Sequence, residues 1–184
     1  MAGDILVFGE LRGGKLKKIT KELVTAARRI SEGLGGEIHA LFTGEGASAA
    51  AEEMKKFGFG KIYVAEEEIL HKYSTEGYAK VLADLVNELK PSYVLLGATA
   101  MGRDLGPRVT ARVDGVMFSD CVDLRVEDGR CIAKRPVYSG KVFIEIAPKG
   151  ERTAFIAIRP NNMPPAEPVD GESRVVNYSS NVTA

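Results

Sequence analysis

The sequence has no tryptophan, and its 184 residues include two cysteines and two histidines. Structural zinc sites usually take four cysteine or histidine ligands, and disulfide-stapled domains need several cysteine pairs. Neither a metal site nor a disulfide framework is therefore expected. The shortage of imidazole and thiol groups also argues against most hydrolase mechanisms, which need a nucleophile and a base. We predict no catalytic residue in this chain.

Net charge and long apolar runs are absent as well. The 25 basic and 25 acidic side chains balance, whereas nucleic-acid binders usually carry a basic surplus. No run approaches the roughly 18 apolar residues of a membrane span, and residues 1–4 show no signal-peptide pattern. We expect a cytoplasmic protein without a nucleic-acid partner or a membrane span. Its 45% hydrophobic and 27% charged residues suit one globular domain.

Strand and helix patterns alternate over the first two thirds of the chain. Short continuous apolar runs predict strands buried on both faces at residues 4–8, 37–42, 61–65 and 93–96. Apolar residues at helical spacing predict helices over 16–33, 47–57, about 75–89 and, after a loop at 97–102, to about 113. In the last of these, Pro107 is expected in the first turn. The alternation predicts an α/β fold: a parallel sheet with helices on both faces.

The pattern changes after residue 115. Apolar and charged residues alternate over 122–127, and Asp128-Gly129 is typical of a two-residue hairpin turn. Further short strands are predicted at 132–137, 142–147 and 153–158, which together form a short antiparallel meander after the parallel sheet. In the simple hairpin register Val126 faces Cys131, so Cys121 and Cys131 are not opposite each other.

The composition shifts once more at Pro160. Four of the eight prolines, Pro160, Pro164, Pro165 and Pro168, fall in this last segment, which ends in mostly polar residues. We expect one α/β domain over residues 1–160. Residues 161–184 are predicted to be a Pro-rich linker or departing arm that contributes no core element.

A glycine-rich turn offers one candidate for nucleotide binding. Gly44, Gly46 and Ala49 fit the Gly-x-Gly-x-x-Ala form of the dinucleotide fingerprint, and Glu66 follows at the distance of a ribose-binding acid. The fingerprint normally follows the first strand of its unit, and here a complete strand and helix precede it. A turn ahead of an alanine-rich helix is the favoured interpretation, with a small NAD-linked enzyme as an alternative.

The loop and helix start after the fourth predicted strand form a second candidate. Ligands of open α/β sheets bind at the carboxyl ends of strands, where helix N–H groups and arginines could hold an anion. Alternatively, Asp104 caps the helix while the arginines form ion pairs or a subunit contact. The residues alone leave both interpretations open. The candidate residues here are Gly97, Thr99, Gly102, Arg103, Asp104 and Arg108.

The same segment carries a family resemblance. Residues 97–112 read GATAMGRDLGPRVTAR and resemble the hallmark segment of the electron-transfer flavoprotein alpha subunit. Four other segments are similar to that family and follow in its order, so that the resemblance spans about residues 4–161. These segments are residues 5–10, 119–120, 135–141 and 158–161.

The resemblance implies a domain related to adenine-nucleotide hydrolase-like folds. In the family this domain packs on a homologous beta subunit, and the two support a separate FAD domain. The heterodimer passes electrons from dehydrogenases to an acceptor. The family's FAD site belongs chiefly to the C-terminal domain of the alpha subunit, whose glycine-rich segment this sequence lacks. No FAD-binding residue is therefore assigned here, and tight FAD binding to this chain is not expected.

For several candidates the resemblance favours interface or structural roles over flavin contact. These residues are Arg103, Arg108, Arg135 and Tyr138. The main hypothesis is thus a scaffold domain of an electron carrier that is not itself an enzyme. The alternative is a free-standing nucleotide-binding or sensor domain that uses residues 97–108.

Overall fold

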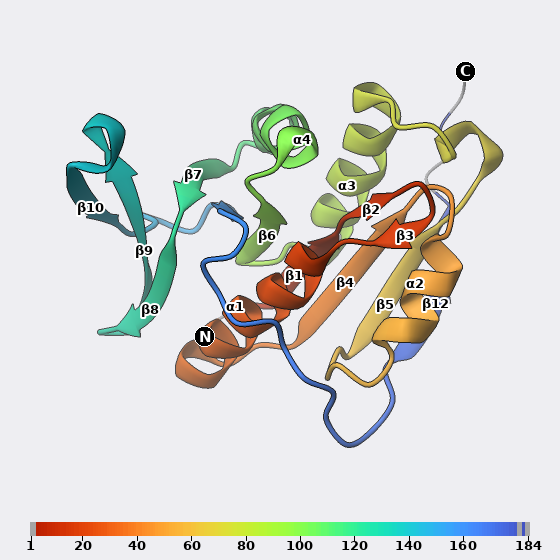
Figure 1. Ribbon diagram of the computed structural model, residues 1–184, viewed down its shortest axis with the longest axis horizontal. Coiled ribbons are helices and arrows are strands. Elements are labelled where there is room, and N and C mark those ends of the chain that lie inside the picture. Colours follow the sequence, from red (N-terminus) through yellow and green to blue (C-terminus); the bar gives the residue numbers. More distant parts are fainter. Residues whose placement is uncertain (1–2, 180–181, 183–184) are drawn as a thin grey trace.

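The computed structural model describes residues 3–179 and residue 182. Its centre is a seven-stranded sheet in which every neighbouring pair is parallel (Figure 1). The strands are β1 (Ile5–Gly9), β4 (Ile38–Thr43), β5 (Lys61–Ala65), β6 (Tyr93–Gly97), β7 (Val116–Cys121), β11 (Ala154–Ile158) and β12 (Arg174–Asn177). Their order is β12-β5-β4-β1-β6-β11-β7. The predicted parallel α/β sheet is confirmed.

Two helices cover each face of this sheet. The helices are α1 (Lys18–Leu34), α2 (Ala47–Met54), α3 (Thr75–Leu89) and α4 (Ala100–Arg112). Successive strand residues point to opposite faces, so Val7 packs in the core under α1 and α2 and Leu6 in the core under α3 and α4. None of the helices in the described part of the chain is long and apolar enough to cross a membrane.

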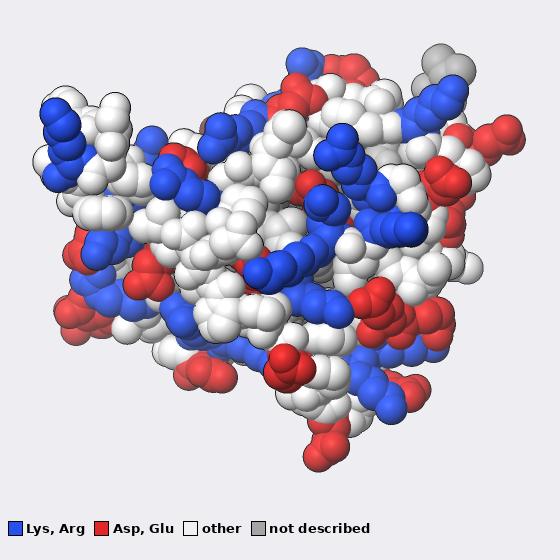
Figure 2. Space-filling view, in the orientation of Figure 1, with Lys and Arg blue, Asp and Glu red and all other residues white. Residues whose placement is uncertain are grey.

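A small antiparallel sheet projects from the body of the domain, at the left of Figure 1. It consists of β8 (Asp123–Glu127), β9 (Arg130–Val137) and β10 (Val142–Ile146), with the short helix η2 (Tyr138–Gly140) between the last two. The predicted pairing of Val126 with Cys131 is confirmed. Only part of this sheet is covered: β8 and β9 pack on α1, while the β10 side forms the lobe at the left of Figure 2.

The strand predicted at residues 153–158 is present, but its predicted place in the meander is wrong. This segment is β11, and it lies between β6 and β7 in the parallel sheet instead of continuing the meander. All five of its residues are buried, and their run Ala-Phe-Ile-Ala-Ile lacks the polar alternation of a half-exposed strand. The edge strand β7, half-buried and poorly patterned, was not predicted.

The expectation that the Pro-rich segment adds no core element is also wrong. Its backbone is bound to α1, since Ala166 N–H donates to the Lys21 carbonyl and Thr25 donates to the Pro164 carbonyl. The segment then forms β12, which pairs in parallel with β5 at the edge of the sheet. The prolines prevent regular structure over most of this segment without detaching it. The FAD domain expected to follow stays a prediction.

Candidate functional site

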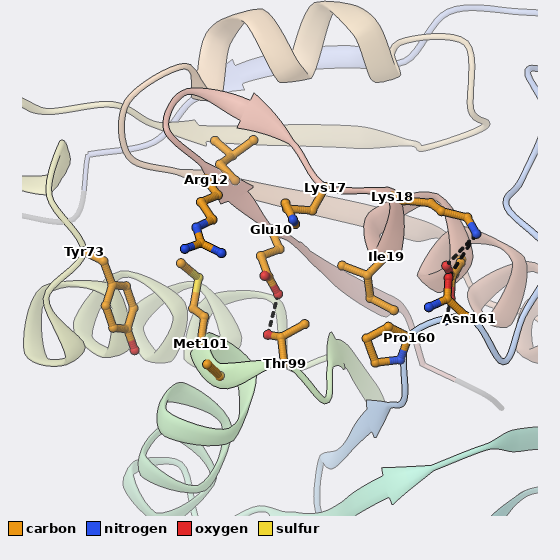
Figure 3. Close-up of a pocket in the computed structure, with 13 residues that line it drawn as sticks. Glu10, Arg12, Lys17, Lys18, Ile19, Tyr73, Thr99, Met101, Pro160 and Asn161 are labelled. Carbon is orange, nitrogen blue, oxygen red and sulfur yellow. Dashed lines mark hydrogen bonds and ion pairs between the residues drawn. The ribbon is translucent and has the colours of Figure 1, made fainter.

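The strand order reverses beside β1. The chain passes from β1 to β4 and β5 on one side and then crosses to β6 on the other side. In open parallel sheets such a switch point leaves a crevice at the carboxyl ends of the two strands. A cleft of about 730 Å³ lies at this position. It is bounded by the starts of α1 and α4, by residues 160–161, and by the hairpin of β2 (Leu11–Arg12) and β3 (Lys15–Leu16) (Figure 3).

A hydrogen bond joins the ends of the two central strands on the floor of the cleft. Thr99 follows β6 and donates its hydroxyl to Glu10 Oε2 at 2.6 Å, while Glu10 directly follows β1 (Figure 3). The Glu10 side chain is buried, and its backbone N–H donates to Thr20 Oγ1 at 3.0 Å. The carboxylate is thus held in a fixed position, where it can accept a hydrogen bond from a ligand hydroxyl or amine.

The rim of the cleft combines apolar side chains with cations. Ile19, Met101 and Pro160 supply apolar surface, and Arg12 extends from β2 across the cleft toward Met101 (Figure 3). Within residues 3–179, the side chains of Arg12 and Lys17 have no hydrogen-bond or ion-pair partner. This arrangement can accept a small molecule that has an apolar ring and a negative charge.

Two of the predicted loop residues have steric roles. A Cβ on Gly102 would lie 1.8 Å from the carbonyl oxygen of Gly97, so only glycine allows α4 to begin this close to β6. A Cβ on Gly97 would lie 2.9 Å from Ile19 Cγ1. Both glycines therefore bring the helix start to the edge of the cleft.

The helix cap differs from the prediction. Thr99, not Asp104, is the N-cap of α4: its backbone is extended and its hydroxyl accepts a hydrogen bond from Gly102 N–H at 3.1 Å. The helix starts earlier than the sequence suggests, because the short Thr99 side chain can serve as cap. Pro107 consequently lies inside the helix and not in its first turn. Its ring nitrogen cannot donate to the carbonyl of Arg103.

Asp104 instead joins α4 to the segment before α3. Its Oδ2 accepts hydrogen bonds from Thr75 at 2.5 Å and from Tyr73 at 2.6 Å. These bonds, that from Thr75 foremost, hold the pKa of Asp104 below its ordinary value. Burial and the bond to Asp104 raise the pKa of Tyr73 to about 12. Arg108 pairs with Glu76 of α3, so both residues connect the two helices.

The remaining candidates lie around Asp120, away from the cleft. Arg159 forms a bidentate pair with Asp120, at 2.9 Å from Nε and 2.6 Å from Nη2, and Arg103 Nη2 lies 3.5 Å from the same carboxylate. The hydrogen bonds from Arg159 hold the pKa of Asp120 below its ordinary value. Arg135 and Tyr138 line a second cavity of about 490 Å³ beside this pair.

The backbone N–H groups of the dinucleotide-like motif are already hydrogen-bonded to a side chain of this protein. Glu66 accepts hydrogen bonds from Gly46 N–H at 2.7 Å and from Ser48 N–H at 2.9 Å, the groups that would hold a pyrophosphate. Burial alone would raise the pKa of Glu66, but the hydrogen bonds from Ser48 and Gly46 keep it below its ordinary value. A carboxylate at this position repels phosphate, so the alternative of a small NAD-linked enzyme is not supported.

The candidates at residues 97–108, Arg135 and Tyr138 thus lie in three places: at the cleft, between α3 and α4, and around Asp120. Several residues that line the cleft were missed. Glu10, Arg12 and Lys17 line the cleft but were not predicted, nor was the pair of Asp120 with Arg159. The position of Glu10 directly after a buried strand was the available signal, because the carboxyl ends of parallel strands form the binding edge.

This architecture, a doubly wound parallel sheet with a cleft at its switch point, defines the chain as an open α/β domain. Residues 5–181 match the family model described as Electron transfer flavoprotein domain. The chain therefore belongs to the electron transfer flavoprotein family.

Similar curated proteins come from bacteria. One is the electron transfer flavoprotein subunit alpha of Clostridium acetobutylicum, 37% identical over 85% of this chain and 47% of the relative. The Bacillus subtilis protein of the same name is 35% identical over 91% of this chain and 50% of its own length. Subunit LctC of the NAD(+),ferredoxin lactate dehydrogenase of Acetobacterium woodii is 32% identical over 84% of this chain and 37% of its own length. The chain spans about half the length of the two alpha subunits.

Proposed function

We propose that this chain is the scaffold domain of an electron transfer flavoprotein alpha subunit. In this role it packs on a beta subunit, and the heterodimer carries electrons from dehydrogenases to an acceptor through FAD. The names of the similar proteins support the electron-transfer role. The chain itself acts as a support and contributes no catalytic residue.

The exposed apolar strand β10 is the observation that carries the heterodimer. Its side chains alternate between the two faces of the small sheet, yet Val142, Phe143 and Ile144 are 47%, 51% and 38% exposed. Exposed apolar patches of this kind mark protein interfaces. β10 is also an edge strand of its sheet: it pairs with β9 on one side, and no described strand pairs with its other side. A beta subunit docked on this lobe would cover both features.

The glycine-rich turn is a poor candidate for holding the pyrophosphate of FAD. The glycine-rich turn at residues 44–49 faces the carboxylate of Glu66, which takes the N–H groups that a pyrophosphate needs. FAD is accordingly proposed to be held by the C-terminal domain of the alpha subunit. We expect the purified 184-residue chain to be colourless, and a yellow 1:1 complex with FAD would contradict this assignment.

Co-expression with the cognate beta subunit, followed by size-exclusion chromatography, tests the heterodimer. The wild-type chain is expected to co-elute with the beta subunit. The double variant Val142→Glu/Ile144→Glu should elute alone, because it places two charges on the apolar lobe. Val169→Glu is the matched control, since Val169 is 42% exposed and lies outside the lobe. Circular dichroism checks that each variant is folded. Separate peaks for the wild-type proteins would overturn the proposal.

The switch-point cleft favours a second candidate function, a nucleotide-binding or sensor domain. Arg12 and Lys17 are cations without partners in the described structure, at the position where open α/β sheets bind ligands. Arg103 does not line the cleft, so Arg12→Ala is the informative variant. Micromolar binding of AMP or ATP in calorimetry, lost in Arg12→Ala and retained in the exposed control Arg130→Ala, would support this function. Binding unchanged by Arg12→Ala would exclude the cleft.

A further inference from the structure

Three guanidinium groups face one carboxylate between the body of the domain and the projecting hairpin. Asp120 is paired with Arg159 and approached by Arg103. Arg135 stands on β9 at the other side of the same cavity, close enough to contribute to the lowered pKa of Asp120. The cavity is lined by the guanidinium groups of Arg135 and Arg159 and by one carboxylate, that of Asp120, so it has an excess of positive charge.

Of these three guanidinium groups, that of Arg135 forms no hydrogen bond or ion pair with the described residues. Its Nε is buried and has no hydrogen-bond partner among the residues that the structure describes. A buried donor without an acceptor is destabilising, and the great majority of such groups in proteins are paired. The oxygens of Asp120 accept hydrogen bonds from Arg159 and Arg103, and none is formed with Arg135. Arg135 Nε therefore needs a hydrogen-bond acceptor that the described residues do not supply.

The backbone around the cavity is also unusual. Asp120, Tyr138 and Ser139 all line it, and all three have positive φ values, of 61°, 49° and 56°. Left-handed backbone is uncommon outside glycine, and such strain persists where the surrounding structure fixes the chain for a function. In this case it turns the η2 segment so that Tyr138 is 79% exposed at the mouth of the cavity.

The cavity is continuous with the apolar face of β10. In the β9–β10 register Arg135 stands opposite Ile144, and Val137 opposite Val142. Directly opposed residues of an antiparallel pair share one face of the sheet. Nearer to β8 the same face is buried against α1 through Ala133, Cys131 and Leu124. Beyond α1 this face projects from the domain, and the exposed Val142 and Ile144 lie next to the half-buried Arg135 in a strip that the described residues cover only in part.

We propose that this strip binds a segment of the beta subunit that carries an aspartate or glutamate next to apolar residues. The apolar residues pack on Val142 and Ile144, and the carboxylate accepts hydrogen bonds from Arg135. This inference rests on the proposed heterodimer and adds the residue that gives the interface its charge specificity. A guanidinium suits this role because its planar array of donors matches a carboxylate.

Calorimetric titration of the 184-residue chain with the cognate beta subunit tests the proposal. Arg135→Ala is expected to weaken binding about 30-fold, as for a central interface arginine, and Arg135→Lys should recover only part of the loss. Arg130→Ala is the matched control, because Arg130 is an exposed arginine on the same strand. Its affinity should stay within about twofold of the wild type. Arg135→Gln, closer in size to arginine, replaces the alanine variant if the latter does not fold.

A double-mutant cycle identifies the partner group. Each acidic residue of the beta subunit is changed to alanine and titrated against the wild-type chain and against Arg135→Ala. One of them should weaken binding to the wild-type chain strongly and to Arg135→Ala hardly at all. If none does, or if Arg135→Ala binds as tightly as the wild type, the inference is wrong while the heterodimer stands. A wild-type chain that does not bind the beta subunit contradicts the heterodimer itself.

Discussion

The carboxylate of Glu66 lies across the N-terminus of α2 and accepts a hydrogen bond from Gly46 N–H at 2.7 Å. The sequence motif at this turn assigns the same acid to a ribose hydroxyl. In the structure the Glu66 carboxylate itself occupies the position that the motif assigns to a bound phosphate, so the turn is already filled by a group of the same chain. A motif that suggests a cofactor here serves the stability of a short helix.

Replacing this acid should lower stability in a pH-dependent way. The folded-state pKa of Glu66 lies below its ordinary value, so its ionised form stabilises the fold above the ordinary pKa. That contribution is lost as the pH falls through the lowered pKa. Glu66→Gln should reduce the free energy of unfolding by about 1 kcal/mol at pH 7, and the difference should shrink toward pH 3. Urea unfolding at both pH values measures it.

The exposed Glu32→Gln is the control for this experiment, and it should leave stability unchanged at both pH values. A loss for Glu66→Gln of equal size at pH 7 and pH 3 would show that the charge of Glu66 does not contribute.

The close contact between α4 and β6 predicts that adding a single methyl group at Gly102 lowers the stability of the fold strongly. Gly102→Ala would place a Cβ 1.8 Å from the Gly97 carbonyl oxygen, and the helix start would have to move. We expect a loss of about 3 kcal/mol in unfolding free energy, as in severe overpacking. Ala111→Ser, which adds one atom on the exposed side of the same helix, should change stability little. An unchanged urea midpoint in Gly102→Ala would contradict the close approach.

The hydroxyl of Thr99 both caps α4 and binds Glu10. Thr99→Val keeps the shape of the side chain but removes both hydrogen bonds, and it should cost about 1–2 kcal/mol. Thr99→Ser retains the hydroxyl and should stay close to the wild type. Thermal unfolding of the three proteins distinguishes these cases. A loss in the serine variant without one in the valine variant would assign the effect to the methyl group instead of the hydroxyl, because valine retains the methyl.

The two cysteines should be chemically inert in the folded protein. Both are free and buried, and burial raises the pKa of Cys121 and of Cys131 to about 12. Because the thiolate is the reactive form, an aromatic disulfide reagent at pH 8 should titrate almost no thiol in the native chain. The same assay in guanidinium chloride should find two. Rapid reaction of the native protein would show that the region around β7 and β9 opens readily.

The first two thirds of the fold were predictable because the signals are local. The helix α3 is an example: it begins and ends as predicted, at Thr75 and Leu89, and its apolar stripe from Tyr78 to Leu89 faces the sheet. The place of β11 could not be predicted in the same way. Its residues follow a hairpin in sequence, but its partner β6 ends more than 50 residues earlier. The pairing of β11 with β6 depends on which sheet edge is still unpaired when the chain returns, and a local sequence pattern does not record this.

The candidate site was predictable only in part. The sequence pointed to residues 97–108 through the position of this loop after a buried strand, and Thr99 and Gly102 do lie at the edge of the cleft. Arg103 and Arg108 are five positions apart on α4 and point to different neighbours, Asp120 and Glu76, because residues on a helix share a face at spacings of three or four. Arg135 and Asp120 line the same cavity because the sheet of β8, β9 and β10 projects beside β7, and no local sequence pattern predicts this arrangement.

The sequence alone determined the alternation of strands and helices, the parallel sheet, and the family resemblance of residues 97–112, since these depend on local periodicity and on contiguous residues. The tertiary structure decided which groups meet. It placed Glu66 at the N-terminus of α2, brought Glu10 to Thr99, and left Arg135 Nε without a hydrogen-bond acceptor among the described residues, close to the exposed apolar strand β10. These outcomes depend on distances between segments far apart in the chain, which packing fixes and sequence spacing does not record.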